Sequence, residues 1–251
     1  MLYECFFDKL NGIIAAIRDT QMDAVTAAAK EIAGRLEQGG LIQVFGTGHS
    51  HIVGEELYAR AGGLIQVRAI MPHELTVDLD FEKSTLMERT DGIARIVFET
   101  HKIRQDDVLI LVSNSGRNPV PVQMALEAKE RGIFTVAITN LTHSKSVESR
   151  DKSGKKLYEI CDIVLDNCGP KGDAAVQVPG RNYAVAPVSN ITGGILAEVL
   201  VCAVVETMLS HGVEPPVYQS ANVDGNDDFN RNAREALKAR FPDLLEAFSS
   251  F

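Results

Sequence analysis

The 251-residue sequence predicts a three-layer α/β sandwich, in which helices cover both faces of a five-stranded parallel sheet. Three observations predict this fold class. Short apolar runs alternate along the chain with longer segments whose apolar residues recur at helical spacing. The runs are apolar throughout, as expected for strands that are buried on both faces. Glycines such as Gly39-Gly40, Gly62-Gly63 and Gly132 follow the helical segments and are typical of helix ends.

The elements follow from these patterns in chain order, beginning with a pair of N-terminal helices. Helices are predicted over residues 2–18, 21–38, 50–61, 92–103, 119–131, 189–209 and 228–240. Strands are predicted over residues 41–45, 64–70, 107–112, 133–138 and 161–166. Three polar or Gly/Pro-rich stretches are expected to be irregular, with room for a short helix in the first two: 71–92, 142–156 and 167–187.

The chain is expected to form one domain over residues 1–251, with the N-terminal helical pair (1–40) and a C-terminal helical tail (212–251) added to one core. The helix predicted over 189–209 is apolar nearly all round and should be buried. This helix and the N-terminal pair offer more apolar surface than one sheet face requires. We therefore expect a homodimer or a homotetramer.

Composition and charge narrow the functional classes. An apolar content of 45% with 24% charged residues is ordinary for a soluble enzyme. The net charge of −9 argues against nucleic acid as a partner. No apolar stretch reaches the ~20 residues that a membrane span needs, and the first residues do not resemble a signal peptide. These observations predict a cytoplasmic protein without a membrane partner.

Two loops of small polar residues follow predicted strands. Gly46-Thr47-Gly48-His49-Ser50 follows the first strand, and Ser113-Asn114-Ser115-Gly116-Arg117-Asn118 follows the third. A loop between a parallel strand and a helix N-terminus offers unpaired N–H groups, which bind anions. The carboxyl ends of parallel strands lie on one edge of a sheet, where ligands bind at the switch point in strand order. The two loops therefore predict a phosphate site.

Other interpretations of the loops are weaker. In a dinucleotide-binding GxGxxG motif the third glycine would stand at His51, and no acidic residue closes the second strand. The phosphate-binding pattern GxxxxGK[ST] is missing as well. A plain turn remains the structural alternative for Ser-Asn-Ser-Gly.

The segments VFGTGHS and VSNSGRNP resemble the Gly-rich loop and the Ser-x-Ser-Gly loop of the SIS (sugar isomerase) domain family. A third resemblance is the strand 162–165 with the turn Cys168-Gly-Pro-Lys-Gly-Asp-Ala174. The similarity spans roughly residues 20–210 and is nearest to phosphoheptose isomerases and sugar-phosphate etherases. It implies the SIS fold and a phosphorylated sugar as ligand.

The resemblance also implies site residues. Those implied to hold the phosphate are Ser113, Asn114, Ser115, Gly116 and Asn118. Those implied to line the sugar are Thr47, Gly48 and Ser50. Lys171 is a further candidate contact, although an exposed loop lysine is the simpler interpretation.

Catalysis needs a base that moves a proton between adjacent carbons. Glu55 and Glu56 are candidates on the helix after the first loop, and the resemblance points to Glu56; two solvated carboxylates are the alternative. His49 in the first loop is the candidate proton shuttle. No metal or other cofactor is expected, because the spacing of His49, His51 and Glu55 matches no established ligand pattern.

Two functions remain open. One is a sugar-phosphate isomerase or lyase that acts next to a carbonyl, and the other is a non-catalytic phosphosugar sensor. The family's isomerases carry a histidine at the start of the last core helix, where this chain has Ser189-Asn190-Ile191-Thr192. The acidic stretch 78–91 could bind a hard cation, although a solvated lid is the more common interpretation, and no motif surrounds His143. His73, the 71–92 segment or the 220–228 segment could complete the pocket of a partner copy.

Overall fold

The computed structural model describes residues 1–78, 80–242 and 244. At its centre lies a five-stranded sheet in the order β2-β1-β3-β4-β5, with each neighbouring pair parallel. The strands are β1 (Ile42–Gly46), β2 (Val67–Ile70), β3 (Val108–Val112), β4 (Phe134–Thr139) and β5 (Ile163–Asp166). The predicted fold class is thereby confirmed.

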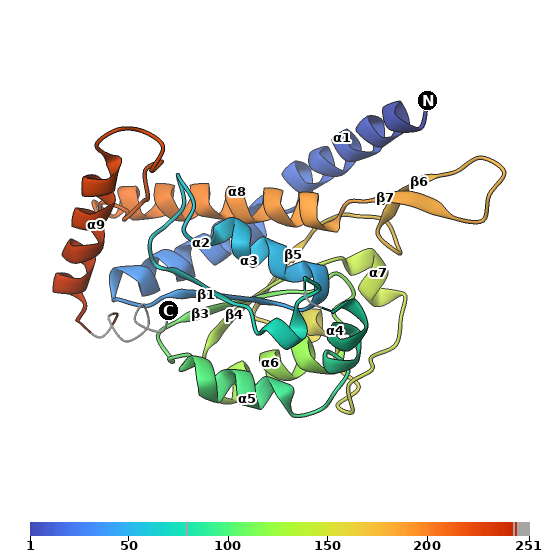
Figure 1. Cartoon of the computed structure of the whole chain (residues 1–251), viewed down its shortest axis with the longest axis horizontal. Coiled ribbons are helices and arrows are strands. Elements are labelled where there is room, and N and C mark those ends of the chain that lie inside the picture. Colours follow the sequence, from blue (N-terminus) through green and yellow to red (C-terminus); the bar gives the residue numbers. More distant parts are fainter. Residues whose placement is uncertain (79, 243, 245–251) are drawn as a thin grey trace.

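Helices cover both faces of this sheet (Figure 1). One face carries α2 (Met22–Glu37), α3 (His51–Leu57) and α8 (Ser189–Ser210). The other carries α5 (Ile93–His101) and α6 (Pro119–Glu130). The remaining helices are α1 (Leu2–Thr20), α4 (Phe81–Met87), α7 (Leu141–Lys145) and α9 (Asn226–Arg240).

The strands feed two separate cores, one on each face. In β3, Val108, Ile110 and Val112 belong to the core shared with α2 and α8. Leu109 and Leu111 belong to the core shared with α5 and α6. Successive side chains of a strand point to opposite faces, so a run that is apolar throughout fills both cores.

The switch point of the sheet lies between β1 and β3. The chain passes from β1 to β2 on one side and then crosses back to β3 on the other side. The loops after β1 and β3 therefore leave neighbouring strands at the same edge. In open α/β sheets this crevice is where ligands bind.

The third helix and the second strand are shorter than predicted. α3 ends at Leu57, where residues 50–61 were expected, and β2 begins at Val67 rather than at Leu64. The intervening chain pairs instead with a distant segment: Gly62 N donates to Tyr218 O, and Ile65 N donates to Pro216 O. This long-range pairing outweighs the local helical pattern.

The 167–187 segment and α8 also differ from expectation. An antiparallel hairpin, β6 (Ala174–Gln177) with β7 (Ala184–Pro187), stands where an irregular loop was predicted, and it projects beside α1 (Figure 1). α8 is long and apolar enough for a membrane span, contrary to the sequence count, yet it packs against α2 and α3 as a core helix does. It is not buried all round, because Ile191 and Leu209 are exposed.

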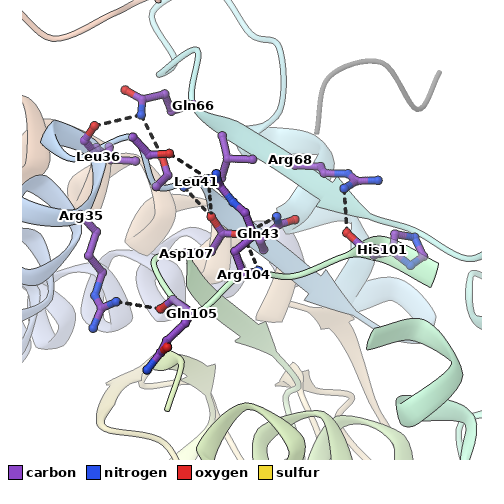
Figure 2. A network of polar contacts seen from close by, with 12 residues as sticks. Arg35, Leu36, Leu41, Gln43, Gln66, Arg68, His101, Arg104, Gln105 and Asp107 are labelled. Carbon is purple, nitrogen blue, oxygen red and sulfur yellow. Dashed lines mark hydrogen bonds and ion pairs between the residues drawn. The ribbon is translucent and has the colours of Figure 1, made fainter. Parts of the chain in front are cut away.

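A buried polar network fixes the amino ends of the strands (Figure 2). Asp107 is fully buried, and its carboxylate accepts hydrogen bonds from Leu41 N (2.9 Å), Gln43 Nε2 (3.0 Å) and Arg104 Nη2 (3.0 Å). Beside it, Gln66 Nε2 donates to Leu36 O and Gly40 O. The network joins the starts of β1 and β3 to the helices that precede them.

Candidate functional site

A cavity of about 290 Å³ opens at the carboxyl ends of β1 and β3. The loop after β1 and the loop after β3 form two of its walls. Residues of α4 and its flanks form a third wall, and the turn before β6 contributes Gly172 and Asp173 to the lining. The lining residues are Thr47, Gly48, His49, Ser50, Val77, Phe81, Ser84, Thr85, Glu88, Ser113, Asn114, Ser115, Asn118, His143, Gly172 and Asp173.

Close packing explains the glycines of both loops. A Cβ on Gly46 would lie 2.6 Å from the carbonyl carbon of Ser50, so the turn after β1 closes only around a glycine. Gly116 has a φ of +57°, and a Cβ there would lie 3.1 Å from Leu157 Cβ. A side chain at either position would push its loop out of place.

The loop after β3 is held by its backbone and keeps side-chain donors. Ser113 Oγ accepts a hydrogen bond from Gly116 N (3.1 Å), which leaves the hydroxyl proton of Ser113 able to donate. Ser113 O accepts from Thr139 Oγ1 (2.7 Å), and Asn114 Oδ1 accepts from Asn167 Nδ2 (2.9 Å). With its oxygen committed, the Asn114 amide presents its nitrogen as the donor.

Glu88 joins the two loops from the third wall. Its Oε2 accepts a hydrogen bond from Thr47 Oγ1 (2.8 Å), and its Oε1 accepts one from Asn118 Nδ2 (2.7 Å). Thr47 and Asn118 are both buried. Because the Thr47 hydroxyl gives its proton to Glu88, its oxygen faces other groups as an acceptor.

Arginine side chains lie near the second loop. Arg150 Nη1 donates to Asn118 Oδ1 (3.0 Å). Burial lowers the pKa of Arg150, and the nearby charges of Arg117 and Arg89 lower it further. Among the described residues that line the cavity, none is lysine or arginine. An anion in the cavity would therefore meet neutral donors directly and cations only at longer range.

His143 carries a fixed hydrogen bond at the edge of the cavity. Its Nδ1 accepts from Gly172 N (3.0 Å), while its own backbone N donates to Asn140 Oδ1 (2.7 Å). Burial lowers the pKa of His143, and the charges of Arg117 and Lys171 lower it further. These effects favour the neutral imidazole.

Comparison with known proteins places this architecture in a family. A model of the SIS domain matches residues 5–140. The chain is 39% identical to a UPF0309 protein of Geobacillus thermodenitrificans, covering 96% of this chain and 97% of the relative. It is 42% identical to a UPF0309 protein of Halalkalibacterium halodurans, covering 88% and 91%. The chain belongs to the SIS domain family.

A solved structure agrees with the SIS assignment at the level of the fold. A phosphoheptose isomerase from Francisella tularensis superimposes with a TM-score of 0.52, covering 81% of this chain and 96% of that one. The two sequences are 18% identical. At this identity the superposition supports the shared fold alone.

The structure brings most of the predicted site residues of this SIS-domain protein together. Those that line the cavity are Thr47, Gly48, His49, Ser50, Ser113, Asn114, Ser115 and Asn118. Gly116 is buried and shapes the second loop from behind. Lys171 is exposed and outside the lining set, although its neighbours Gly172 and Asp173 belong to it.

The two predicted glutamates lie apart from this cavity. Glu55 lines an adjacent cavity of about 270 Å³, where its Oε1 lies 3.4 Å from Nε2 of the buried His51. Glu56 faces the groove between α3 and α8 and pairs with Arg60. Consecutive helix positions point about 100° apart, and in α3 this offset directs the two side chains to different surfaces. His73 lines the Glu55 cavity as well.

Sequence reasoning missed Glu88, His143 and Asp173. Glu88 stood within an acidic stretch that is normally interpreted as solvated, and no motif marks His143. Asp173 Oδ1 accepts from Val188 N and Ser189 N at the start of α8. All three reach the cavity from segments distant from the loops in sequence, so only the packed fold brings them together.

Proposed function

We propose that this protein binds a phosphorylated sugar in the cavity between the loops after β1 and β3. The observation that carries the proposal is the convergence of both loops at the switch point, with hydroxyl and amide side chains lining one cavity. The 12-residue α6 begins at the second loop, and its dipole favours negative charge there. Its first turn adds no backbone donors, because Pro119 and Pro121 carry no N–H and Val120 N donates to Glu88 O.

The polar groups suggest an orientation for the ligand. Ser113 and Ser115 supply hydroxyl donors, which suit the phosphate. Glu88 and Asp173 supply carboxylate oxygens, which repel a phosphate and accept hydrogen bonds from hydroxyl groups. We therefore assign the 113–116 side to the phosphate and the Glu88 side to the sugar hydroxyls.

For the reaction we propose isomerisation or elimination next to a carbonyl. Two carboxylates are suitable bases: Glu88 inside the cavity, and Glu55 beside His51 in the adjacent one. The segment 76–78 separates the two cavities, since Val77 lines one while Thr76 and Asp78 line the other. The pairing of Glu56 with Arg60 makes it a weaker candidate than the sequence suggested.

A non-catalytic phosphosugar sensor is the second candidate. The observation that favours it is the start of α8, where Ser189 donates to Asp173 and no histidine stands at positions 189–192. A sensor would need the phosphate loop and no proton-transfer group. The two candidates thus differ in turnover and agree in binding.

One experiment separates the proposals. A panel of aldose and ketose phosphates is titrated calorimetrically and then incubated with the protein, with products followed by NMR. We expect binding that is lost in Ser113→Ala, and turnover that is reduced in Glu88→Gln or Glu55→Gln but kept in the exposed Glu82→Gln control. Binding without turnover of every compound would leave the sensor. Unchanged binding in Ser113→Ala would refute the proposed site.

We also propose self-association, through α1 and the exposed side of α8. Tyr3, Phe7 and Ile14 are exposed on α1, which projects beyond the sheet (Figure 1), and Ile191 is exposed on α8. A second copy would remove these apolar groups from water. Phe7→Glu should reduce the mass measured by sedimentation, whereas Phe229→Glu on α9 should not.

A further inference from the structure

His143 lies where α7 begins, next to the second loop, and is not used by the phosphate site described so far. Its Nδ1 receives a hydrogen bond from the backbone N–H of Gly172 at 3.0 Å. A backbone N–H can only donate, so Nδ1 must be the unprotonated nitrogen of the ring. The proton of the neutral imidazole is then on Nε2, on the far side of the ring from Gly172.

The charges around the ring favour the same state. Burial lowers the pKa of His143, Arg117 from the second loop and Lys171 from the turn before β6 lower it further, and Asp173 opposes them. A second proton on the ring would also break the bond from Gly172, because Nδ1 would become a donor facing a donor. The structure therefore holds a neutral ring with one defined donor.

We propose that His143 is a ligand-binding residue of the phosphosugar cavity, which presents the Nε2–H of a neutral imidazole to an oxygen of the bound sugar phosphate. The inference rests on the proposed function, and it adds a donor of fixed direction on the β4 side of the cavity. A neutral imidazole can polarise a carbonyl or hold an oxygen without becoming charged. Gly172, which fixes the ring, lines the same cavity.

The geometry also gives Gly172 and the turn around it a function. The turn 170–173 carries both the N–H that orients His143 and the Asp173 carboxylate that caps α8. Gly172 has a φ of +80°, which a residue with a side chain rarely adopts. The start of α8 and the ring of His143 are therefore positioned by one short segment.

The first test determines which ring nitrogen of His143 carries the proton. Protein labelled with ¹⁵N-histidine is examined by NMR near pH 7.5, with His143→Gln used to assign the His143 signals. We expect an unprotonated Nδ1 and a protonated Nε2, and a change at Nε2 when a binding sugar phosphate is added. A charged ring, the opposite tautomer, or an unchanged Nε2 in the saturated complex would overturn the inference.

The second test measures affinity. His143→Ala should weaken binding of a sugar phosphate about tenfold, the usual loss for one hydrogen bond to a polar ligand group. His143→Gln keeps an N–H donor at the position of Nε2 and should bind within about threefold of the wild type. His211→Gln, an exposed histidine that contacts Glu37 at the far end of α8, is the matched control.

The outcomes distinguish the inference from the proposed function. If the wild type binds no sugar phosphate, the proposed function fails and this inference fails with it. If the wild type binds, Ser113→Ala does not, and His143→Ala binds as tightly as the wild type, only the inference fails. Should His143→Ala not fold, the NMR change at Nε2 and the His143→Gln titration decide the question.

Discussion

Each end of the central sheet has a carboxylate that accepts several hydrogen bonds, but the two carboxylates serve different purposes. At the amino ends of β1 and β3, the Asp107 carboxylate is fully buried and receives donors from Leu41, Gln43 and Arg104 (Figure 2). At the carboxyl ends, the Glu88 carboxylate receives donors from Thr47 and Asn118 but also lines a cavity. A carboxylate enclosed by donors locks the fold, whereas one that faces a cavity can still meet a ligand.

The largest effect is expected at the amino end. Asp107→Ala removes the acceptor of a buried ion pair with Arg104 and leaves the donors of Leu41 and Gln43 unpaired. We expect a loss of about 3–5 kcal/mol in the free energy of unfolding, measured with urea. The affinity of the remaining folded protein for a sugar phosphate should not change. A loss of affinity in the folded protein would mean that the two ends are not separate.

The next largest effect is expected at the carboxyl end, where the affinity for a sugar phosphate should fall more than the stability. The double variant Ser113→Ala/Ser115→Ala removes two hydroxyl donors from the phosphate side. Each hydrogen bond to a charged group contributes about 1.5–3 kcal/mol, so calorimetry should detect little or no binding. The free energy of unfolding should fall by only about 1–3 kcal/mol, because Ser113 Oγ also accepts from Gly116 N. Ser210→Ala, at the exposed end of α8, is the control and should change neither quantity.

A smaller effect is expected for Glu88, which both joins the two loops and lines the cavity. In Glu88→Gln one oxygen still accepts from Thr47, but the new amide nitrogen faces the donor of Asn118. We expect sugar-phosphate affinity or turnover to fall about tenfold, with a stability loss of about 1 kcal/mol. If stability falls as it does in Asp107→Ala while affinity is kept, Glu88 is a structural lock like Asp107.

The smallest expected effect is a dependence of stability on pH, which arises at the amino end of the sheet. Burial lowers the pKa of His101, whose carbonyl accepts from Arg68 (Figure 2). The folded state binds a proton on the His101 ring less well than the unfolded chain does. The stability that the neutral ring contributes is therefore present above the ordinary histidine pKa of about 6.5 and is lost as the pH falls. The urea midpoint should drop between about pH 7.5 and 5.5, and His101→Gln should flatten that drop. An equal flattening by the exposed His211→Gln would contradict this assignment.

Several features of the site could be predicted from the sequence for a local reason. The loops after Phe45 and Val112 combine a preceding apolar strand, small polar residues and a following helix, and each of these signals lies within a few residues. Pro119 after Asn118 likewise marks the start of α6, which the structure shows. Local signals were enough for these positions.

Other features could not be predicted, because their cause is distant in sequence. The early end of α3 depends on hydrogen bonds from Gly62 and Ile65 to residues more than a hundred positions away. Helical periodicity placed Glu55 and Glu56 near the first loop, but the direction in which α3 packs turns them toward other surfaces. The apolar sequence of α8 predicts a helix that is buried on all sides, whereas in the structure the sheet covers only one of its sides.

The sequence by itself determined the layered α/β class, the parallel sheet and the two donor loops, because apolar periodicity and turn residues act over short stretches of chain. Only the tertiary structure decided which charged groups face the cavity. Glu88, His143 and Asp173 come from three separate connections, and their meeting depends on strand order and on the packing of α4 and the 170–173 turn. Strand order is set by the sum of many long-range contacts, which no short pattern encodes.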